Sequence, residues 1–458
     1  MSNPGDADNT AVTDIRDLAA WLASGCKPPE RFAIGTEHEA FGFRLAGNAP
    51  PAYAPADGSA GIRALLEEIA ETERLVPILD DGNIIGLKDA GASLSLEPGG
   101  QFELSGATVA SLHETRAELE HHIARLHRAR AKLGLGFMPL GFHPCARRED
   151  MPFMPKGRYA IMRRYMPKVG KRGLDMMTRT CTVQVNLDFA SEADMVTKLR
   201  VALALQPLAT AMFANSPFYE GKPNGLLSNR AQVWTDTDAA RAGIPKIVFE
   251  KGFGFEAYAN WLVDVPMYFI YRDGRYHDVA GASFRDFMAG KLAGFEGERA
   301  TLGDFADHST TVFPDVRLKR YIETRGADSG SPAMMLAQSA FWTGIFYNPA
   351  ALAAAAALVR DIPYDTLPHL RAQVPAAGLA TPFRSGTLRD LMREAVAIAG
   401  QGLKARAALD DAGHGEEIYL APLREIAAGA PTQAEAWLQR YKDVWLGDIT
   451  KIFAEAAL

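Results

Sequence analysis

The segment TRTCTVQVNLDF, residues 178–189, alternates polar and apolar side chains with almost no interruption. Successive side chains of a β-strand point to opposite faces, so this pattern predicts a strand with one polar face and one mostly apolar face. Such a strand suits an antiparallel sheet that packs helices against its apolar side. The expected polar face carries Thr178, Thr180, Thr182, Gln184, Asn186 and Asp188.

A second strand-like segment, FAIGTEHEAFGF over residues 32–43, places two carboxylates two residues apart. Glu37 and Glu39 must therefore share one face with Phe41 and Phe43. Two like charges side by side repel each other, so the fold has to supply a compensating positive charge.

Two further segments have the same half-polar character. In LSLEPGGQFELSG, residues 94–106, Gly99 and Gly100 turn the chain between Glu97 and Glu103. The segment VRLKRYIETRGAD, residues 316–328, predicts a strand whose polar side carries Arg317, Lys319, Tyr321, Glu323 and Arg325. Together with a largely helical, Ala-rich region from about residue 333, these segments predict an α+β fold.

Several glutamates on one sheet face are costly. A close carboxylate pair repels by about 1 kcal/mol in water and about 4 kcal/mol at an effective dielectric constant near 20. A divalent cation relieves this compactly, and oxygen donors without a Cys/His cluster favour Mg²⁺ or Mn²⁺ over zinc. Spacing alone leaves open the alternative that the glutamates lie apart on solvated edges.

Residues 156–179 form a basic, glycine-containing segment. It suits either phosphate binding or a solvated basic surface, and the sequence leaves both open. Neither G-x-x-x-x-G-K-[ST] nor G-x-G-x-x-G occurs, which disfavours Walker-type and Rossmann nucleotide sites. The basic side chains are Lys156, Arg158, Arg163, Arg164, Lys168, Lys171, Arg172 and Arg179.

Composition limits the functional classes. The 458 residues are 48% hydrophobic, enough for a large core, and the net charge of −6 argues against general nucleic-acid binding. Three dispersed cysteines and a polar, acidic N-terminus without a recognisable leader predict a cytoplasmic protein. The uncharged stretch 340–359 is split by Asn348–Pro349, which predicts two buried helices and no membrane span.

Several long segments resemble the glutamate–cysteine ligase family of plants and alphaproteobacteria. They are RTCTVQVNLDFASEADM, LALQPLATAMFANSPFYEGKPNG, VWTDTD, DVPMYF, FPDVRLKRYIETRGAD and TPFR, and the likeness runs from about residue 30 to the C-terminus. The resemblance implies a fold related to glutamine synthetase, with a curved antiparallel sheet that forms a funnel-shaped active site flanked by helices. It implies an N-terminal extension and helix over residues 1–28 and a single catalytic domain over residues 29–458.

The resemblance also implies an activity: ATP-dependent joining of L-glutamate to L-cysteine, which gives γ-glutamylcysteine in the first step of glutathione synthesis. Expected partners are these small molecules, without nucleic acid or membrane, in a monomer or homodimer. Mg²⁺ is the expected metal, with Mn²⁺ as an alternative.

Site residues follow from the same resemblance. The expected metal ligands are Glu37, Glu39, Glu97, Glu103, Gln184 and Glu323. Arg325 acts on the transferred phosphoryl group together with Glu323, and the expected nucleotide contacts are Lys171, Arg317 and Lys319. Arg158 and Arg230 are expected to clamp substrate carboxylates, because guanidinium groups bind carboxylates bidentately. Tyr268 and Trp234 are expected to line the amino-acid pocket.

Two alternatives stay open. A ligase that joins glutamate to another amine would use the same metal and phosphate groups, and a metal-loaded binding protein would bind without turnover. In addition, plant members of the family are controlled by disulfides, whereas KLAGFEGE and MMLAQSAFW carry no cysteine here. The sequence therefore predicts that this redox switch is absent.

Overall fold

The strands of the chain assemble mainly into one antiparallel sheet. The computed structural model describes residues 8–458, and in this part of the chain nine strands form a sheet in the order β14-β15-β7-β1-β5-β4-β3-β2, with β6 also paired to β1. Each of these pairings is antiparallel, so the predicted α+β class with an antiparallel sheet is confirmed. The strands are β1 Ile34–Arg44, β2 Val76–Asp80, β3 Asn83–Asp89, β4 Ala92–Leu96, β5 Phe102–Ser105, β6 Leu135–Met138, β7 Val183–Leu187, β14 Val316–Leu318 and β15 Ile322–Thr324.

Strand register brings the polar side chains together. β1 lies between β5 and β7, where Glu37 is directly opposite Gln184 and Glu39 is directly opposite Glu103. Directly opposed residues of neighbouring strands point to the same face. The alternation seen in the sequence therefore produces one continuous polar face.

Two predicted strands differ from those observed. Residues 178 and 179 end the helix α5, Gly173–Arg179, so β7 begins only at Val183. The predicted single strand over 316–328 is a hairpin of β14 and β15, in which Arg317 is opposite Glu323. Because the hairpin keeps the two-residue period on both arms, these two side chains still share a face.

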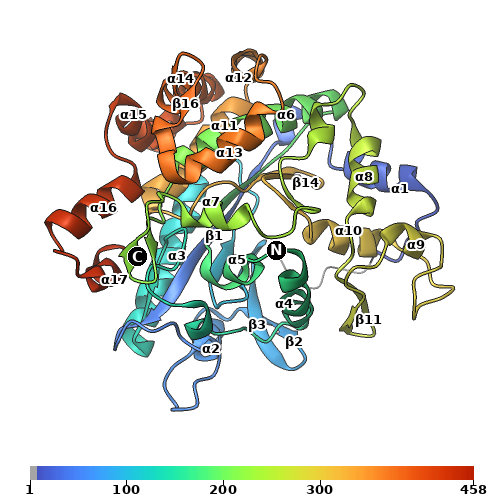
Figure 1. Cartoon of the computed structure of the whole chain (residues 1–458), viewed down its shortest axis with the longest axis horizontal. Helices are drawn as coiled ribbons and strands as arrows, with labels where there is room; N and C mark the ends of the chain where they lie inside the picture. The colour runs from blue at the N-terminus through green and yellow to red at the C-terminus, as the bar shows by residue number, and fades with distance from the viewer. Residues whose placement is uncertain (1–7) are drawn as a thin grey trace.

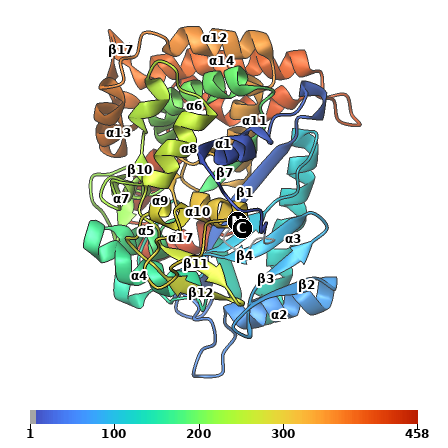
Figure 2. The same cartoon turned by 90° about the vertical axis from the view of Figure 1, so that its right-hand side faces the viewer.

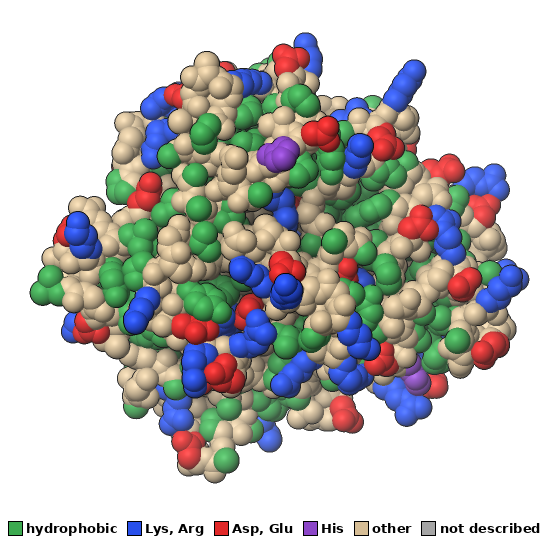
Figure 3. All heavy atoms as spheres, viewed as in Figure 1, with side chains coloured by type: hydrophobic (Ala, Val, Ile, Leu, Met, Phe, Trp, Pro, Cys, Tyr) green, Lys and Arg blue, Asp and Glu red, His purple; other side chains and the backbone are tan. Residues whose placement is uncertain are grey.

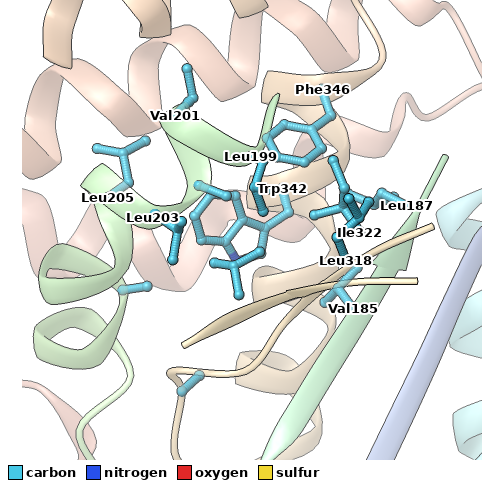
Figure 4. Close-up of a cluster of buried hydrophobic side chains, with 14 of the residues drawn as sticks. Val185, Leu187, Leu199, Val201, Leu203, Leu205, Leu318, Ile322, Trp342 and Phe346 are labelled. Carbon is cyan, nitrogen blue, oxygen red and sulfur yellow. The ribbon is translucent and has the colours of Figure 1, made fainter. Parts of the chain in front are cut away.

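The apolar face of the sheet packs against buried helices. Val185 and Leu187 of β7 and Ile322 of β15 contact a core around Trp342, which is fully buried (Figure 4). This core is formed with α6, Glu192–Met212, and α11, Pro332–Phe346. Burying one aliphatic side chain of this size contributes about 1.5–3 kcal/mol, so this face anchors the sheet.

Helices lie on both sides of the sheet (Figures 1 and 2). The α2, α3, α6 and α11 helices pack against the sheet, while α4, α5 and α7 lie in front of it in the view of Figure 1. The remaining bounds are α1 Ile15–Ala23, α2 Ile62–Glu73, α3 Leu112–Leu133, α4 Gly157–Val169, α7 Asn229–Trp234, α8 Phe255–Asp264, α9 Phe284–Met288, α10 Leu302–Thr310, α12 Pro349–Val359, α13 Thr366–Ala377, α14 Leu388–Arg406, α15 Ala421–Ala428, α16 Gln433–Asp443 and α17 Ile452–Glu455.

The uncharged stretch 340–359 covers the end of α11 and all of α12, with Asn348 as the N-cap between them. Within residues 8–458, no single helix has the length and apolarity to cross a bilayer. The pair α11–α12 passes by length and composition only when the two are taken together, and it bends by 95°. The division into residues 1–28 and 29–458 stays a prediction, and residues 1–7 lie outside the described part.

Candidate active site

A pocket, called here the central pocket, lies over the polar face of the sheet; it holds about 770 Å³ of empty space, including space open to solvent. Its floor comes from the strands and its walls from α4, α5 and α7. The residues on which the site argument depends are Glu37, Glu39, Glu97, Glu103, Gln184, Arg317 and Arg325 on the sheet side, and Arg158, Arg230 and Trp234 on the helix side. The pocket therefore brings together ten of the residues that the sequence predicted for the site.

Carboxylates crowd one end of this pocket. The Glu37, Glu39 and Glu103 side chains are buried, and Glu97 at the end of β4 joins them. Burial raises the pKa of Glu39 well above its usual value, and the charges of Glu97 and Glu103 raise it further. Burial, together with the charge of Glu37, also raises the pKa of Glu103 to about 7. Glu39 and Glu103 thus have too little positive charge nearby to favour their ionised forms.

The donor chemistry of this group fits a hard divalent cation. Glutamate oxygens are the ligands that Mg²⁺ and Mn²⁺ prefer, and a cation would offset the carboxylate repulsion that adds to burial in raising the pKa of Glu39. Among residues 8–458, however, no group of three or more His, Cys, Asp or Glu side chains has an arrangement that could hold a metal ion. The predicted metal role of these glutamates therefore stays a prediction.

Glu323 stands apart from this group. Its fully buried carboxylate forms ion pairs with Arg317 at 2.8 Å, Arg325 at 2.7 Å and Lys319 at 3.1 Å. Burial alone would raise the pKa of Glu323, but these three cations outweigh it and hold the pKa well below the usual value. The charge of Glu323 is thus already neutralised by side chains.

Gln184 connects the carboxylates with the arginines. Its Nε2 donates to Glu37 Oε2 at 2.9 Å, and its Oε1 accepts a hydrogen bond from Arg325. Both ends of the amide are therefore engaged within the protein. This arrangement orients Arg325 toward the pocket.

Two buried arginines form the opposite wall. Arg158 on α4 donates to the Thr310 hydroxyl at 3.0 Å and stacks on the Phe269 ring, while Arg230 on α7 donates to the Arg325 carbonyl at 2.7 Å. Within residues 8–458 the Nε of each arginine has no hydrogen-bond partner. A buried guanidinium with a free N–H group is well suited to bind a ligand carboxylate.

The N-terminus of α7 is fixed by a buried carboxylate. Asp328 accepts hydrogen bonds from the hydroxyls of Ser216 and Ser228 at 2.6 and 2.9 Å, and from the Asn215 N–H at 2.8 Å. Ser228 is the N-cap of α7, two residues before Arg230. This network determines where Arg230 enters the pocket.

Four predicted site residues lie outside the central pocket lining: Glu323, described above, and Tyr268, Lys171 and Lys319. Tyr268 is buried, with its hydroxyl near Met166 Sδ and the Arg241 guanidinium over its ring. Lys171 is an exposed residue of the loop between α4 and α5. Lys319 is buried against Glu323. Their predicted substrate and nucleotide contacts stay predictions.

The basic segment 156–179 divides in two. Arg158 faces the pocket, whereas Arg163, Arg164, Lys168 and Lys171 are exposed. Lys and Arg side chains gather over α4 and α5 on this face of the molecule (Figure 3). Half of the eight basic side chains therefore lie on a solvated surface, whereas Lys156, Arg158 and Arg179 are buried.

Sequence reasoning missed other residues of the wall. Thr310 and Phe313 line the pocket, and the nearby Asp315–Arg371 ion pair supports it. Phe313 and Asp315 belong to the segment FPDVRLKRYIETRGAD, which carries the family resemblance. The alternation of polar and apolar residues alone did not mark these two positions. Arg371 lies in a helical region where no motif marks it.

Comparison with known proteins identifies the family. The model of glutamate-cysteine ligase family 2 matches residues 33–455. Chloroplastic glutamate–cysteine ligase of Nicotiana tabacum is 49% identical over 439 residues, which are 96% of this chain and 82% of that protein. Chloroplastic glutamate–cysteine ligase B of Oryza sativa subsp. japonica is 48% identical over 96% of this chain and 86% of its own length.

A crystal structure of glutamate–cysteine ligase from Francisella tularensis in complex with AMP has a TM-score of 0.49 and 12% identity, covering 93% of this chain and 88% of that one.

The predicted cytoplasmic location is contradicted by these comparisons, because the similar relatives are named chloroplastic. The prediction rested on dispersed cysteines and a polar N-terminus, and neither property specifies a compartment. The match over residues 33–455 and the identity of nearly one half place this chain in the glutamate–cysteine ligase family.

Proposed function

We propose that this chain joins the γ-carboxylate of L-glutamate to the amine of L-cysteine at the expense of ATP. The products are γ-glutamylcysteine, ADP and phosphate, as in the first step of glutathione synthesis. Family membership supports this proposal. The observation that carries it in the molecule is one pocket with buried glutamates on one side and the arginines Arg158, Arg230 and Arg325 around them.

The glutamates and arginines serve different parts of the reaction. Glu37, Glu39, Glu97 and Glu103 would hold Mg²⁺, or Mn²⁺ through the same oxygen donors. When bound, the metal screens the phosphate charges from the attacking carboxylate. Gln184 holds Arg325 beside this group through its hydrogen bond.

The arginine wall binds and orients the amino acid. Arg158 and Arg230 each offer a free Nε–H to a substrate carboxylate, and Trp234 Nε1 also has no hydrogen-bond partner within residues 8–458. Fixing the substrate in this way holds its γ-carboxylate in position for phosphoryl transfer, which lowers the entropic cost of the step. Tyr268 belongs to the apolar cluster that packs against Trp234 of this wall.

The chemistry has two steps. A γ-carboxylate oxygen of glutamate attacks the terminal phosphorus of ATP, the bond to the ADP oxygen breaks, and γ-glutamyl phosphate forms. The cysteine amine then attacks the acyl carbon, phosphate leaves, and the amine loses a proton. Arg325 and Arg317 stabilise the negative charge of the transferred phosphoryl group, while Glu323 keeps both guanidinium groups in place. Lys319 and Lys171 remain candidates for more distant nucleotide contacts.

One assay separates this proposal from its alternatives. ADP formation is measured with ATP, Mg²⁺ and L-glutamate, with and without L-cysteine, and then with a panel of other amines. The proposal expects ADP formation that depends on glutamate and is highest with cysteine. A stronger response to another amine indicates a different ligase, and Mg²⁺ binding without glutamate-dependent ADP indicates a binding protein.

A further inference from the structure

A second, smaller cavity lies beside the central pocket and shares Arg230, Trp234, Phe313 and Arg325 with it. Its lining also includes Arg371 and Asp315, which do not line the central pocket. These two residues are 56 positions apart in the chain and come from different elements. Arg371 lies on α13, and Asp315 follows β13, Phe313–Pro314.

Arg371 joins two walls of the substrate site. Its Nε and one terminal nitrogen donate to the two carboxylate oxygens of Asp315, at 2.8 and 3.1 Å. That terminal nitrogen also donates to the Trp234 carbonyl at 3.1 Å. A planar guanidinium can make these three bonds at once, whereas an ammonium group has no comparable fork.

The contacts of Arg371 belong to a closed ring. The Arg325 N–H donates to the Asp315 carbonyl at 3.1 Å, and Arg230 donates to the Arg325 carbonyl at 2.7 Å. Arg230 and Trp234 lie on the same short helix, α7, and the Trp234 carbonyl returns the ring to Arg371. Removing one residue of this ring therefore affects the relative positions of all the others.

Aromatic contacts support the same arrangement. The Trp234 and Phe313 rings meet edge to face at 5.8 Å, and the Arg325 guanidinium lies 5.9 Å from the Phe313 ring centre. Phe313 lies two residues before Asp315, so the position of Asp315 also affects the aromatic wall. Arg371 thus controls both hydrogen bonds and packing in the site without lining the central pocket.

We propose that Arg371 is a positioning residue for the amino-acid substrate, because it joins Asp315 to the end of α7 and so sets Arg230 and Trp234 relative to Arg325. This inference rests on the proposed function, since it assigns the positioned groups to glutamate. Arg371 itself contacts the Asp315 side chain and the Trp234 carbonyl, whereas Arg230 contacts the substrate.

The test compares R371K with a matched control, R393K. Arg393 also pairs with a carboxylate, Asp390, and donates to a carbonyl, that of Ala427, but it lies on α14 outside the central pocket. R371K is expected to raise the KM for glutamate by about tenfold, while the KM for ATP and kcat change by less than about threefold. R393K is expected to match the wild type.

A second readout does not depend on activity. The indole N–H resonance of Trp234 is assigned in ¹⁵N-labelled protein by its loss in W234F. It is expected to shift in R371K and in D315N but not in R393K. If R371K folds poorly, D315N tests the same ion pair from its other partner.

The outcomes separate the two proposals. Equal rises in KM for glutamate and ATP, or an unchanged Trp234 resonance in both R371K and D315N, overturn the positioning role. Absence of glutamate-dependent ADP formation by the wild type overturns the proposed function instead. In that case the Trp234 resonance still decides whether Arg371 positions the wall.

Discussion

Arg317 and Glu323 lie directly opposite each other on β14 and β15, and the guanidinium donates to both carboxylate oxygens at 2.8 and 3.0 Å. Both side chains are buried, and Glu323 also pairs with Lys319 and Arg325. One carboxylate thus compensates three cations at the edge of the central pocket. Such a group is stable only while every member is present.

The variant E323Q is therefore expected to be strongly destabilised. It leaves three buried or nearly buried cations without their carboxylate, and breaking a buried ion pair costs about 3–5 kcal/mol. Urea unfolding followed by circular dichroism measures the loss of unfolding free energy. The control is E455Q, which removes the partly exposed partner of Arg440 and is expected to change stability little. A loss below about 1 kcal/mol in E323Q would contradict the structural role of this cluster.

The variant R230K is expected to raise the KM for glutamate about tenfold or more, with a smaller effect on the KM for ATP. A lysine keeps the charge but loses the free Nε–H and the planar geometry that suit a carboxylate. Initial-rate kinetics at varied glutamate and varied ATP measure the two constants separately. Equal changes in both constants would argue that Arg230 does not bind the amino acid.

The sequence predicted the polar floor of the site because the two-residue period of a strand leaves little freedom. Once β1, β5 and β7 pair, Glu37 and Glu39 must meet Gln184 and Glu103 on one face. The start of β7 was predicted wrongly, since Thr178 fits the alternating pattern but belongs to α5. Local alternation does not exclude a helix that tertiary packing favours.

The walls of the site were less predictable. The Arg371–Asp315 pair joins two elements that only the folded chain brings together, and neither residue lies in a periodic pattern. The hairpin between β14 and β15 lacks the Gly or Asn turn residues that mark a tight turn, so the segment was predicted as one strand. The family resemblance identified Tyr268, but a motif does not specify which way a side chain points.

Acidification is expected to destabilise the protein through His308. Burial lowers its pKa from 6.5 to about 4, its Nε2–H donates to the Leu262 carbonyl at 2.9 Å, and its Nδ1 has no partner within residues 8–458. Between these pH values the unfolded chain binds a proton that the folded chain does not. Stability is therefore full above about pH 6.5 and falls as the pH decreases toward 4.

The contribution of His308 over this range is on the order of 3 kcal/mol. Urea unfolding of H308Q between pH 4 and 7 is expected to show a shallower pH dependence than the wild type. The control H369Q changes an exposed histidine and should leave the slope unchanged. The same slope in H308Q and wild type would mean that His308 does not set this acid sensitivity.

Thiol reactivity is expected to separate the three cysteines. Cys26 is half-buried, burial raises the pKa of Cys145 to about 11, and Cys181 is fully buried with a pKa raised well above its usual value by burial. Because the thiolate is the reactive form, Cys26 should react first with iodoacetamide at pH 8. Cys145 should react slowly and Cys181 only after unfolding, as peptide mass spectrometry over time would measure. In C26S the fast phase should disappear, and rapid labelling of Cys181 in the native protein would contradict its full burial.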